Sequence, residues 1–308
     1  MHNTLHSVDI GSQGSCALVV QAVLPVMICA PSPSTFTIDG GTHVNFAPPY
    51  EALHRVILPV IRRFGVAATC ACPTVSLYRN GAPLSRRGRL VLSVVPSPAP
   101  APTPIHLLEL GSIVSIHCWC VSDAACSVTA AAALAACNAA ASAAFPAAAL
   151  TSEITTSDEL DAAGPRSRSL SACMGLCAVS STGCVLGADR MLLDMRPNAC
   201  EGGGKLSDGL QMAQEIVDEV AAAVQVGACV DHHTCDQLPL FMSLAVGPSS
   251  VRVQPPSNHV LSACDVASQF TGATFRVEES DNGCVILSCS PSLKQRSAPK
   301  PAGSAGPL

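Results

Sequence analysis

Aromatic and charged side chains are both scarce in this chain of 308 residues. Phe, Trp and Tyr make up 3% of the sequence, with one Trp and two Tyr. RNA-binding sheets of the RRM and OB types stack bases on several exposed rings, so this composition argues against them. Charged residues make up 13%, against a usual share of about a quarter, and the formal net charge is −5. The chain therefore has no general basic coat, and any nucleic-acid contact must come from a local patch.

Paired CxxC motifs are absent, although the chain contains 17 cysteines. The cysteines closest to each other in sequence are Cys70 and Cys72, Cys118 and Cys120, and Cys173 and Cys177. These pairs do not form the paired zinc-binding pattern. A secreted disulfide scaffold would be shorter and would usually have an even number of cysteines. Because the cysteines alternate with Ala and Val at apolar positions, we expect buried thiols in a reducing compartment.

Long uninterrupted apolar runs are also missing. No stretch of eighteen clean apolar residues occurs, so no membrane span is indicated. The run 16–30 contains Gln21 and Pro25, and the residues before it include no Lys or Arg. A signal peptide begins with a basic region, so we expect this run to form a core helix that Pro25 interrupts.

Apolar residues recur with both helical and strand periods along the chain, which indicates an α/β protein. The patterns predict helices over 49–64, 124–144, 211–226, 236–245 and 259–270, and strands over 34–38, 66–74, 89–95, 107–121, 173–180, 183–187, 274–277 and 285–289. The polar segment 152–169 is expected to be a loop. The Pro/Ala-rich segment 96–104 is the clearest linker.

Two helix starts carry residues of chemical interest. His259 opens a helix, where the positive end of the dipole lowers the pKa of a histidine and favours the neutral, nucleophilic imidazole. An ordinary exposed or capping histidine gives the same pattern. Asp236 and Gln237 open another helix, although Asp is also a common N-cap residue.

Three further clusters each have two interpretations. Gly40 to Thr42 offers backbone N–H groups to a phosphate, but a strand-to-helix turn explains it equally well and the P-loop pattern is missing. His232 and His233, beside Cys229 and Cys235, suggest a metal site, yet the two histidines are adjacent rather than four residues apart. The only basic cluster consists of Arg79, Arg86, Arg87 and Arg89. It is either a solvated hairpin or a contact for RNA phosphates.

Taken in order, six segments share the pattern of one family. They are a Gly/Ser-opened helix at 9–25, a GGT…APP block at 40–49, the helix end at 58–65, the strand at 181–188, a VD…DQL…ALA segment at 230–245, and a His-led helix followed by TGATFRV at 259–277. Together they resemble the RNA 3′-terminal phosphate cyclases. The resemblance covers residues 8–290, tightly in these blocks and loosely between 80 and 180.

The resemblance implies an α/β fold of repeated βαβαββ-type units, each with two helices on a four-stranded sheet, and a smaller inserted α/β domain. We expect the cyclase core at 1–96 and 179–290, the inserted domain at 105–178 and a disordered tail at 291–308. The family has one further α/β unit, with phosphate-binding arginines, before the point where this chain begins. We therefore expect an N-terminally truncated member, or a misplaced start at Met1, with weakened turnover.

The reaction implied by the resemblance is the ATP-dependent conversion of an RNA 3′-phosphate to a 2′,3′-cyclic phosphate. His259 would attack the α-phosphate of ATP and form a His–AMP intermediate. A divalent metal, Mg²⁺ or another ion, would assist, through ligands that the sequence does not identify. The residues that would line the nucleotide pocket are Gln21, Pro48, Pro49, His233, Asp236 and Gln237.

Two alternatives remain open. The chain could be a non-catalytic rRNA-processing scaffold of the same superfamily, although those relatives lack the nucleophile and His259 favours the cyclase. It could also be an inactive fragment. We expect RNA 3′ ends as partners, with no DNA and no membrane, and a location in the nucleus or cytoplasm; the sequence leaves the oligomeric state open.

Overall fold

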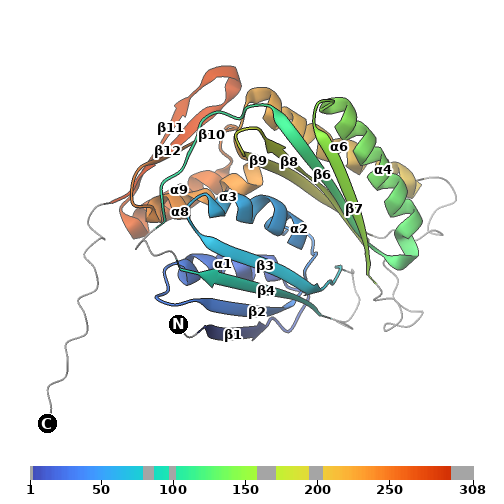
Figure 1. The fold of residues 1–308 in the computed structure, drawn as a ribbon, viewed down its shortest axis with the longest axis horizontal. Coiled ribbons are helices and arrows are strands. Elements are labelled where there is room, and N and C mark those ends of the chain that lie inside the picture. The colour runs from blue at the N-terminus through green and yellow to red at the C-terminus, as the bar shows by residue number, and fades with distance from the viewer. Residues whose placement is uncertain (1–2, 79–86, 97–101, 158–170, 194–203, 293–308) are drawn as a thin grey trace, which may run out of the picture.

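The computed structural model describes residues 3–78, 87–96, 102–157, 171–193 and 204–292 (Figure 1). Within them the chain forms three four-stranded sheets with helices packed against them. This arrangement confirms the predicted α/β class. Most of the predicted linker, the tail from residue 293, and residues 79–86 of the basic cluster lie outside the described residues.

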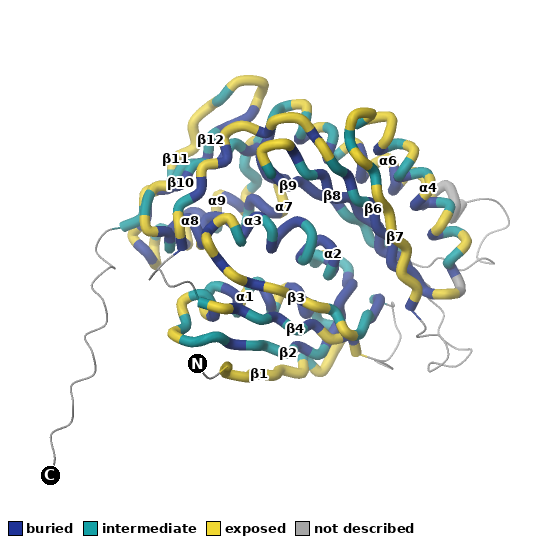
Figure 2. The backbone as a smooth tube through the Cα atoms, in the orientation of Figure 1, coloured by how far each residue is buried: buried dark blue, intermediate teal, exposed yellow. Residues whose placement is uncertain are grey.

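The first sheet has the strand order β1-β2-β4-β3. Its strands are β1 (Thr4–Asp9), β2 (Ser34–Gly40), β4 (Gly88–Val95) and β3 (Ala67–Thr74). β1 pairs parallel with β2, and the other two pairs are antiparallel. Sequence patterning missed β1, because every residue of this edge strand is exposed and the apolar alternation of a half-buried strand is absent (Figure 2).

Helix α1 (Cys16–Ile28) packs against this sheet and continues through Pro25. The expected interruption at Pro25 was therefore wrong. A proline inside a helix removes one hydrogen bond and costs about 3 kcal/mol. The buried face of α1, which includes Val20, Leu24 and Met27, offsets that cost. The Ser15 side chain caps the first turn by accepting a hydrogen bond from the Leu18 N–H at 3.2 Å.

The predicted helix 49–64 is confirmed as three consecutive segments. They are α2 (Tyr50–Ala52), a π-helical turn η1 (Leu53–Ile57) and α3 (Leu58–Arg62). These segments lie between the first and second sheets and contact both (Figure 1). Burial on two sides explains why their apolar residues are not confined to one face.

The second sheet has the order β7-β6-β8-β9. Its strands are β7 (Ala149–Ser157), β6 (Ile113–Asp123), β8 (Ser171–Ser180) and β9 (Val185–Leu193). The segment 152–169 was expected to be a loop, and its first part is instead strand β7. β7 is mostly exposed at the sheet edge, so its polar residues concealed it (Figure 2). Its parallel pairing with β6 supplies the hydrogen bonds that propensity did not indicate.

Two helices cover the outer face of the second sheet. The turn η2 (Ala124–Cys126) leads into α4 (Ser127–Ala144), which packs against β6 and against α6 (Gly204–Val226). Among the described helices, α4 alone is long and apolar enough to cross a membrane, a test that helices covering a protein core also pass. Residue 178, the expected domain boundary, lies within β8, and β9 pairs with that strand. The division into domains stays a prediction.

The third sheet has the order β11-β12-β10-β5. Its strands are β11 (Thr274–Glu279), β12 (Val285–Ser290), β10 (Ser249–Val253) and the two-residue β5 (His106–Leu107), with η3 (Asp281–Gly283) between β11 and β12. Helices α8 (Leu238–Leu244) and α9 (Asn258–Thr271) pack against each other and against this sheet. The short helix α7 (His232–Cys235) precedes α8. One continuous buried cluster joins the three sheets.

Candidate functional site

Helix α9 places His259 in its first turn. Ser257 is the N-cap, and its hydroxyl accepts a hydrogen bond from the Val260 N–H at 3.4 Å. His259 is exposed and lies near the positive end of the α9 helix dipole. Val260 is buried, so this apolar contact and the serine cap together fix the turn that carries His259.

A cavity of about 320 Å³ lies between α1, α8 and α9. Its lining residues are Gln21, Pro25, Asp236, Gln237, Leu240, Phe241, Ala263, Val266, Ala267, Phe270 and Thr271. The apolar walls and a few convergent polar groups are typical of a small-molecule site, and the volume lies at the lower end of the range for such sites.

His259 belongs to the same face of α9 as the cavity wall. Positions four, seven and eleven residues after it are Ala263, Val266 and Phe270, which all line the cavity. Residues at these spacings share one side of a helix. The imidazole therefore lies one turn beyond the wall formed by Ala263, toward the start of α9.

Asp236 and Gln237 contribute polar groups from the junction of α7 and α8. The Gln237 amide Nε2 donates a hydrogen bond of 2.5 Å to Asp236 Oδ1. Burial raises the pKa of Asp236, while the Gln237 hydrogen bond and the nearby imidazoles of His233 and His259 act to lower it. His259 is thus within electrostatic range of the Asp236 carboxylate. Three predicted site residues, Gln21, Asp236 and Gln237, meet at one cavity.

The other predicted pocket residues are placed elsewhere. Pro49 is the N-cap of α2, directly after Pro48, and neither proline is among the cavity-lining residues. His233 also does not line the cavity, and its ring lies 3.8 Å from the ring of His232, centroid to centroid. The structure brings His233 to Glu219 instead, at 3.9 Å between Nε2 and Oε1.

The Gly40–Gly41 pair has a packing role. The Gly41 N–H donates to the Gly14 carbonyl at 2.8 Å, and the Cys16 N–H donates to the Gly41 carbonyl at 2.9 Å. A Cβ atom on Gly41 would lie 2.8 Å from the Gln13 carbonyl oxygen. The pair therefore lets the loop approach the start of α1, the helix that carries Gln21, and the Gly41 N–H is not available to a phosphate.

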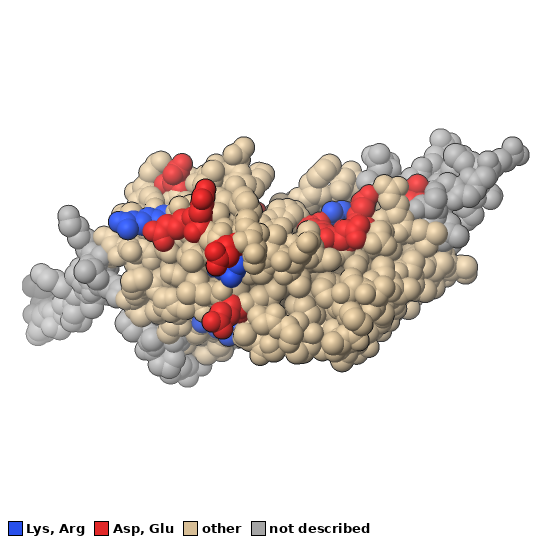
Figure 3. Space-filling view, turned by 90° about the horizontal axis from the view of Figure 1, so that it is seen from above, with Lys and Arg blue, Asp and Glu red and all other residues tan. Residues whose placement is uncertain are grey.

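The two described arginines of the basic cluster interact with aspartates. Arg87 forms an ion pair with Asp9, and Arg89 makes two hydrogen bonds to Asp39, at 2.6 and 2.9 Å. Arg79 and Arg86 lie outside the described residues. On the face shown in Figure 3, the described charged side chains form small separate groups, most of which contain both signs. Any RNA contact there would have to be local.

Two acidic residues were missed by sequence analysis. Glu219 of α6 accepts a 2.6 Å hydrogen bond from Arg190 and faces His232 and His233. Asp189 of β9 has its pKa raised to about 7, mainly by burial. No local pattern marks either residue, because their partners come from other elements.

Comparison with known proteins gives one family. The model of the RNA 3′-terminal phosphate cyclase family matches residues 1–277. A protein of Drosophila melanogaster with that name is 27% identical over 284 residues, which is 92% of this chain and 73% of the relative. One from Pyrobaculum aerophilum is 29% identical over 277 residues, or 89% of this chain and 71% of the relative. One from Ectopseudomonas mendocina is 42% identical over 106 residues, or 34% of this chain and 29% of the relative.

Proposed function

This chain belongs to the RNA 3′-terminal phosphate cyclase family, and on that premise we propose that it uses ATP to convert an RNA 3′-phosphate into a 2′,3′-cyclic phosphate. One observation carries the proposal beyond the family match. His259 starts the helix whose same face lines a cavity with Asp236 and Gln237. The proposed nucleophile therefore lies beside a cavity large enough for a small molecule and near convergent polar groups.

The proposed chemistry begins with the neutral imidazole of His259. A ring nitrogen attacks the α-phosphorus of ATP, forming an N–P bond as the bond to the β-phosphate oxygen breaks and pyrophosphate leaves. An oxygen of the RNA 3′-phosphate then takes the AMP and breaks the N–P bond. The vicinal 2′-oxygen attacks the activated phosphorus, loses its proton and expels AMP. This first step requires the neutral form of the imidazole, because the lone pair of the attacking nitrogen forms the N–P bond.

We propose that Gln21, Asp236 and Gln237 hold the nucleotide in the cavity. Pro48, Pro49 and His233, the last by stacking the face of its ring on the base, are proposed as further contacts on the strength of the family resemblance. Asp236 is the only carboxylate among the lining residues, which fits Mg²⁺, since proteins often hold this ion through one or two carboxylates and the substrate phosphates. Such an ion would neutralise charge on the triphosphate.

The test is to follow transfer of label from ATP labelled in its α-phosphate. We expect the wild-type chain to form an acid-labile covalent adduct and His259→Ala to form none. His106→Ala is the matched control, because His106 is also exposed but lies on β5, outside the cavity lining; it should label like wild type. Label retained by His259→Ala would show that another residue is the nucleophile. RNA binding without any adduct in wild type would favour a non-catalytic scaffold.

We also propose an intracellular, reducing location, in the nucleus or cytoplasm. Sixteen free cysteines occur among the described residues, and most of them are buried. Burial raises the pKa of thiols such as Cys70, to about 12, and keeps them in the unreactive protonated form. RNA 3′ ends are the proposed partners, without DNA and without a membrane.

A further inference from the structure

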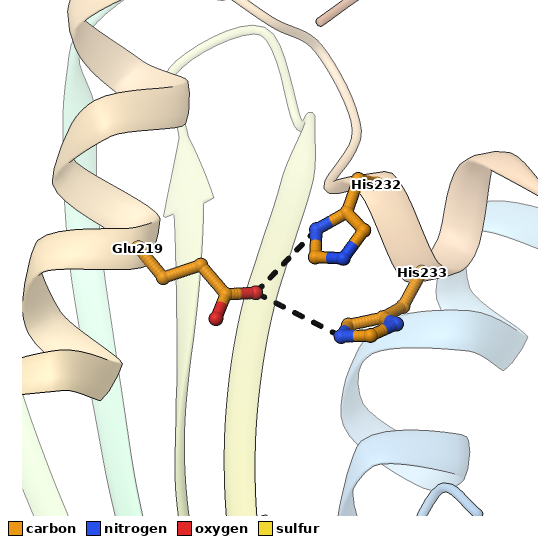
Figure 4. A group of neighbouring side chains, drawn as sticks. All are labelled: Glu219, His232 and His233. Carbon is orange, nitrogen blue, oxygen red and sulfur yellow. Dashed lines mark ion pairs between the residues drawn. The ribbon is translucent and has the colours of Figure 1, made fainter. Parts of the chain in front are cut away.

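A carboxylate and two imidazoles face one another outside the cavity. Glu219 extends from α6 toward His232 and His233 of α7 (Figure 4). Glu219 Oε1 lies 3.5 Å from His232 Nδ1 and 3.9 Å from His233 Nε2. One ligand atom from each residue falls within 4.8 Å of the other two.

Hydrogen bonding does not account for this arrangement. Separations of 3.5 and 3.9 Å exceed the usual N–H···O distance. Glu219 Oε1 is buried and has no hydrogen-bond partner. The other oxygen, Oε2, accepts a 2.6 Å bond from Arg190 Nη2. Arg190 therefore fixes the carboxylate with one oxygen free to face the histidines, and a buried acceptor of this kind calls for a partner.

A metal ion would supply that partner. Zinc binds imidazole nitrogen and carboxylate oxygen at about 2.0–2.2 Å in tetrahedral geometry, which separates neighbouring ligand atoms by about 3.3 Å. The two carboxylate–imidazole separations, 3.5 and 3.9 Å, are longer than this, and all three ligand atoms lie within 4.8 Å of one another, so an ion would draw them together. Two imidazoles and one carboxylate suit zinc and neighbouring transition metals better than Mg²⁺, which prefers oxygen ligands.

The surrounding residues hold this group of side chains in place and leave it accessible to an ion. Asp231 caps α7 by accepting a hydrogen bond from the Thr234 N–H at 2.7 Å, and it also accepts one from the Gly187 N–H of β9 at 3.2 Å. This cap holds the His232–His233 pair against β9. The histidine side chains are 44% and 61% exposed, so an ion can enter and a water can take a fourth position.

We propose that Glu219, His232 and His233 form a binding site for one divalent transition-metal ion of the Zn²⁺ class, with Arg190 orienting the carboxylate. The cysteines close to the histidines in sequence are not ligands, since Cys229 and Cys235 are buried and outside the group. The ion would join α6 to α7, near Asp236, whose pKa responds to both histidines. The proposal does not depend on cyclase activity, because its tests measure metal binding.

The experiment uses the full chain, stripped with a chelator and titrated with Zn²⁺ by calorimetry and with Co²⁺ by visible absorption. We expect one ion per chain and a tetrahedral Co²⁺ spectrum without a thiolate charge-transfer band. Arg190→Ala should lower the affinity by roughly 10–100-fold, and Glu219→Gln and His232→Ala by at least as much. Glu215→Gln is the matched control, because Glu215 lies one turn earlier on α6 and also faces Arg190, at 4.0 Å; its affinity should equal that of wild type.

Three results would overturn the proposal. Zn²⁺ binding by Glu219→Gln and His232→Ala that is as tight as in wild type would remove the assigned ligands. A thiolate band that disappears on cysteine alkylation would assign the ion to cysteines. An unchanged Zn²⁺ affinity in His233→Ala would remove His233 from the metal ligands, and weakened ATP binding in the same variant would leave it with a nucleotide contact alone. If a variant fails to fold, the wild-type chain alone tests the proposal. Zn²⁺ should protect His232 and His233 from modification by diethylpyrocarbonate, as measured by peptide mass spectrometry. Modification of both histidines in the presence of Zn²⁺ would refute the site.

Discussion

Replacing Asp189 by Asn should make the stability of this chain less dependent on pH. Asp189 lies on β9, opposite Gly175 of β8. Burial is the main cause that raises the pKa of Asp189 from 3.8 to about 7, and the charges of Asp231 and Glu219 raise it further, while Arg190 and His43 act to lower it. The carboxyl group is therefore costly to ionise in the folded chain.

The direction and size of this pH dependence follow from the linkage between proton binding and folding. Because the folded-state pKa of Asp189 lies above the unfolded value of 3.8, the folded chain holds the proton more tightly, and stability is lost as pH rises between the two values. At 1.36 kcal/mol per pKa unit the complete loss is about 4 kcal/mol. Between pH 5 and pH 8 the loss is about 2.5 kcal/mol, since part of it has already occurred by pH 5.

The assay is urea unfolding of wild type and Asp189→Asn at pH 5, 6, 7 and 8. The variant should gain about 2.5 kcal/mol in unfolding free energy relative to wild type across this range, with most of the gain below pH 7. Asp265→Asn is the control, since Asp265 is exposed on α9, and its difference from wild type should stay constant. Parallel pH curves for wild type and Asp189→Asn would refute the reasoning.

Two further predictions concern packing and capping. In Gly175→Ala the new Cβ would lie 2.2 Å from a ring carbon of Trp119, so overpacking should lower the unfolding free energy by about 1–3 kcal/mol; Gly247→Ala, whose Cβ would meet its nearest atom at an ordinary 3.5 Å, should unfold much closer to wild type in the same urea titration. Ser257→Ala removes the hydroxyl that accepts from the Val260 N–H and should cost about 1 kcal/mol, together with a lower yield of the ATP-derived adduct. Ser257→Asp, which restores a capping oxygen, should recover the stability; a yield unaffected by either change would disconnect the cap from the chemistry.

The elements that sequence analysis predicted correctly have clear periodicity. The helix predicted at 211–226 lies within α6, and the one predicted at 259–270 is α9, because each presents one apolar face to a core. The strands at β2, β3 and β4 were found for the same reason. The edge strands β1 and β7 were missed, since an exposed edge strand has no alternating apolar pattern and is held by pairing with its neighbour.

The sequence by itself determined the α/β class, the family and the presence of His259, Asp236 and Gln237 at helix starts, because these depend on local patterns and short motifs. Only the tertiary structure decided which residues meet. The cavity combines Gln21 of α1 with residues of α8 and α9, and Glu219 reaches His232 and His233 from a different helix. Such contacts depend on how sheets and helices pack, and packing brings together side chains whose distance along the chain carries no signal.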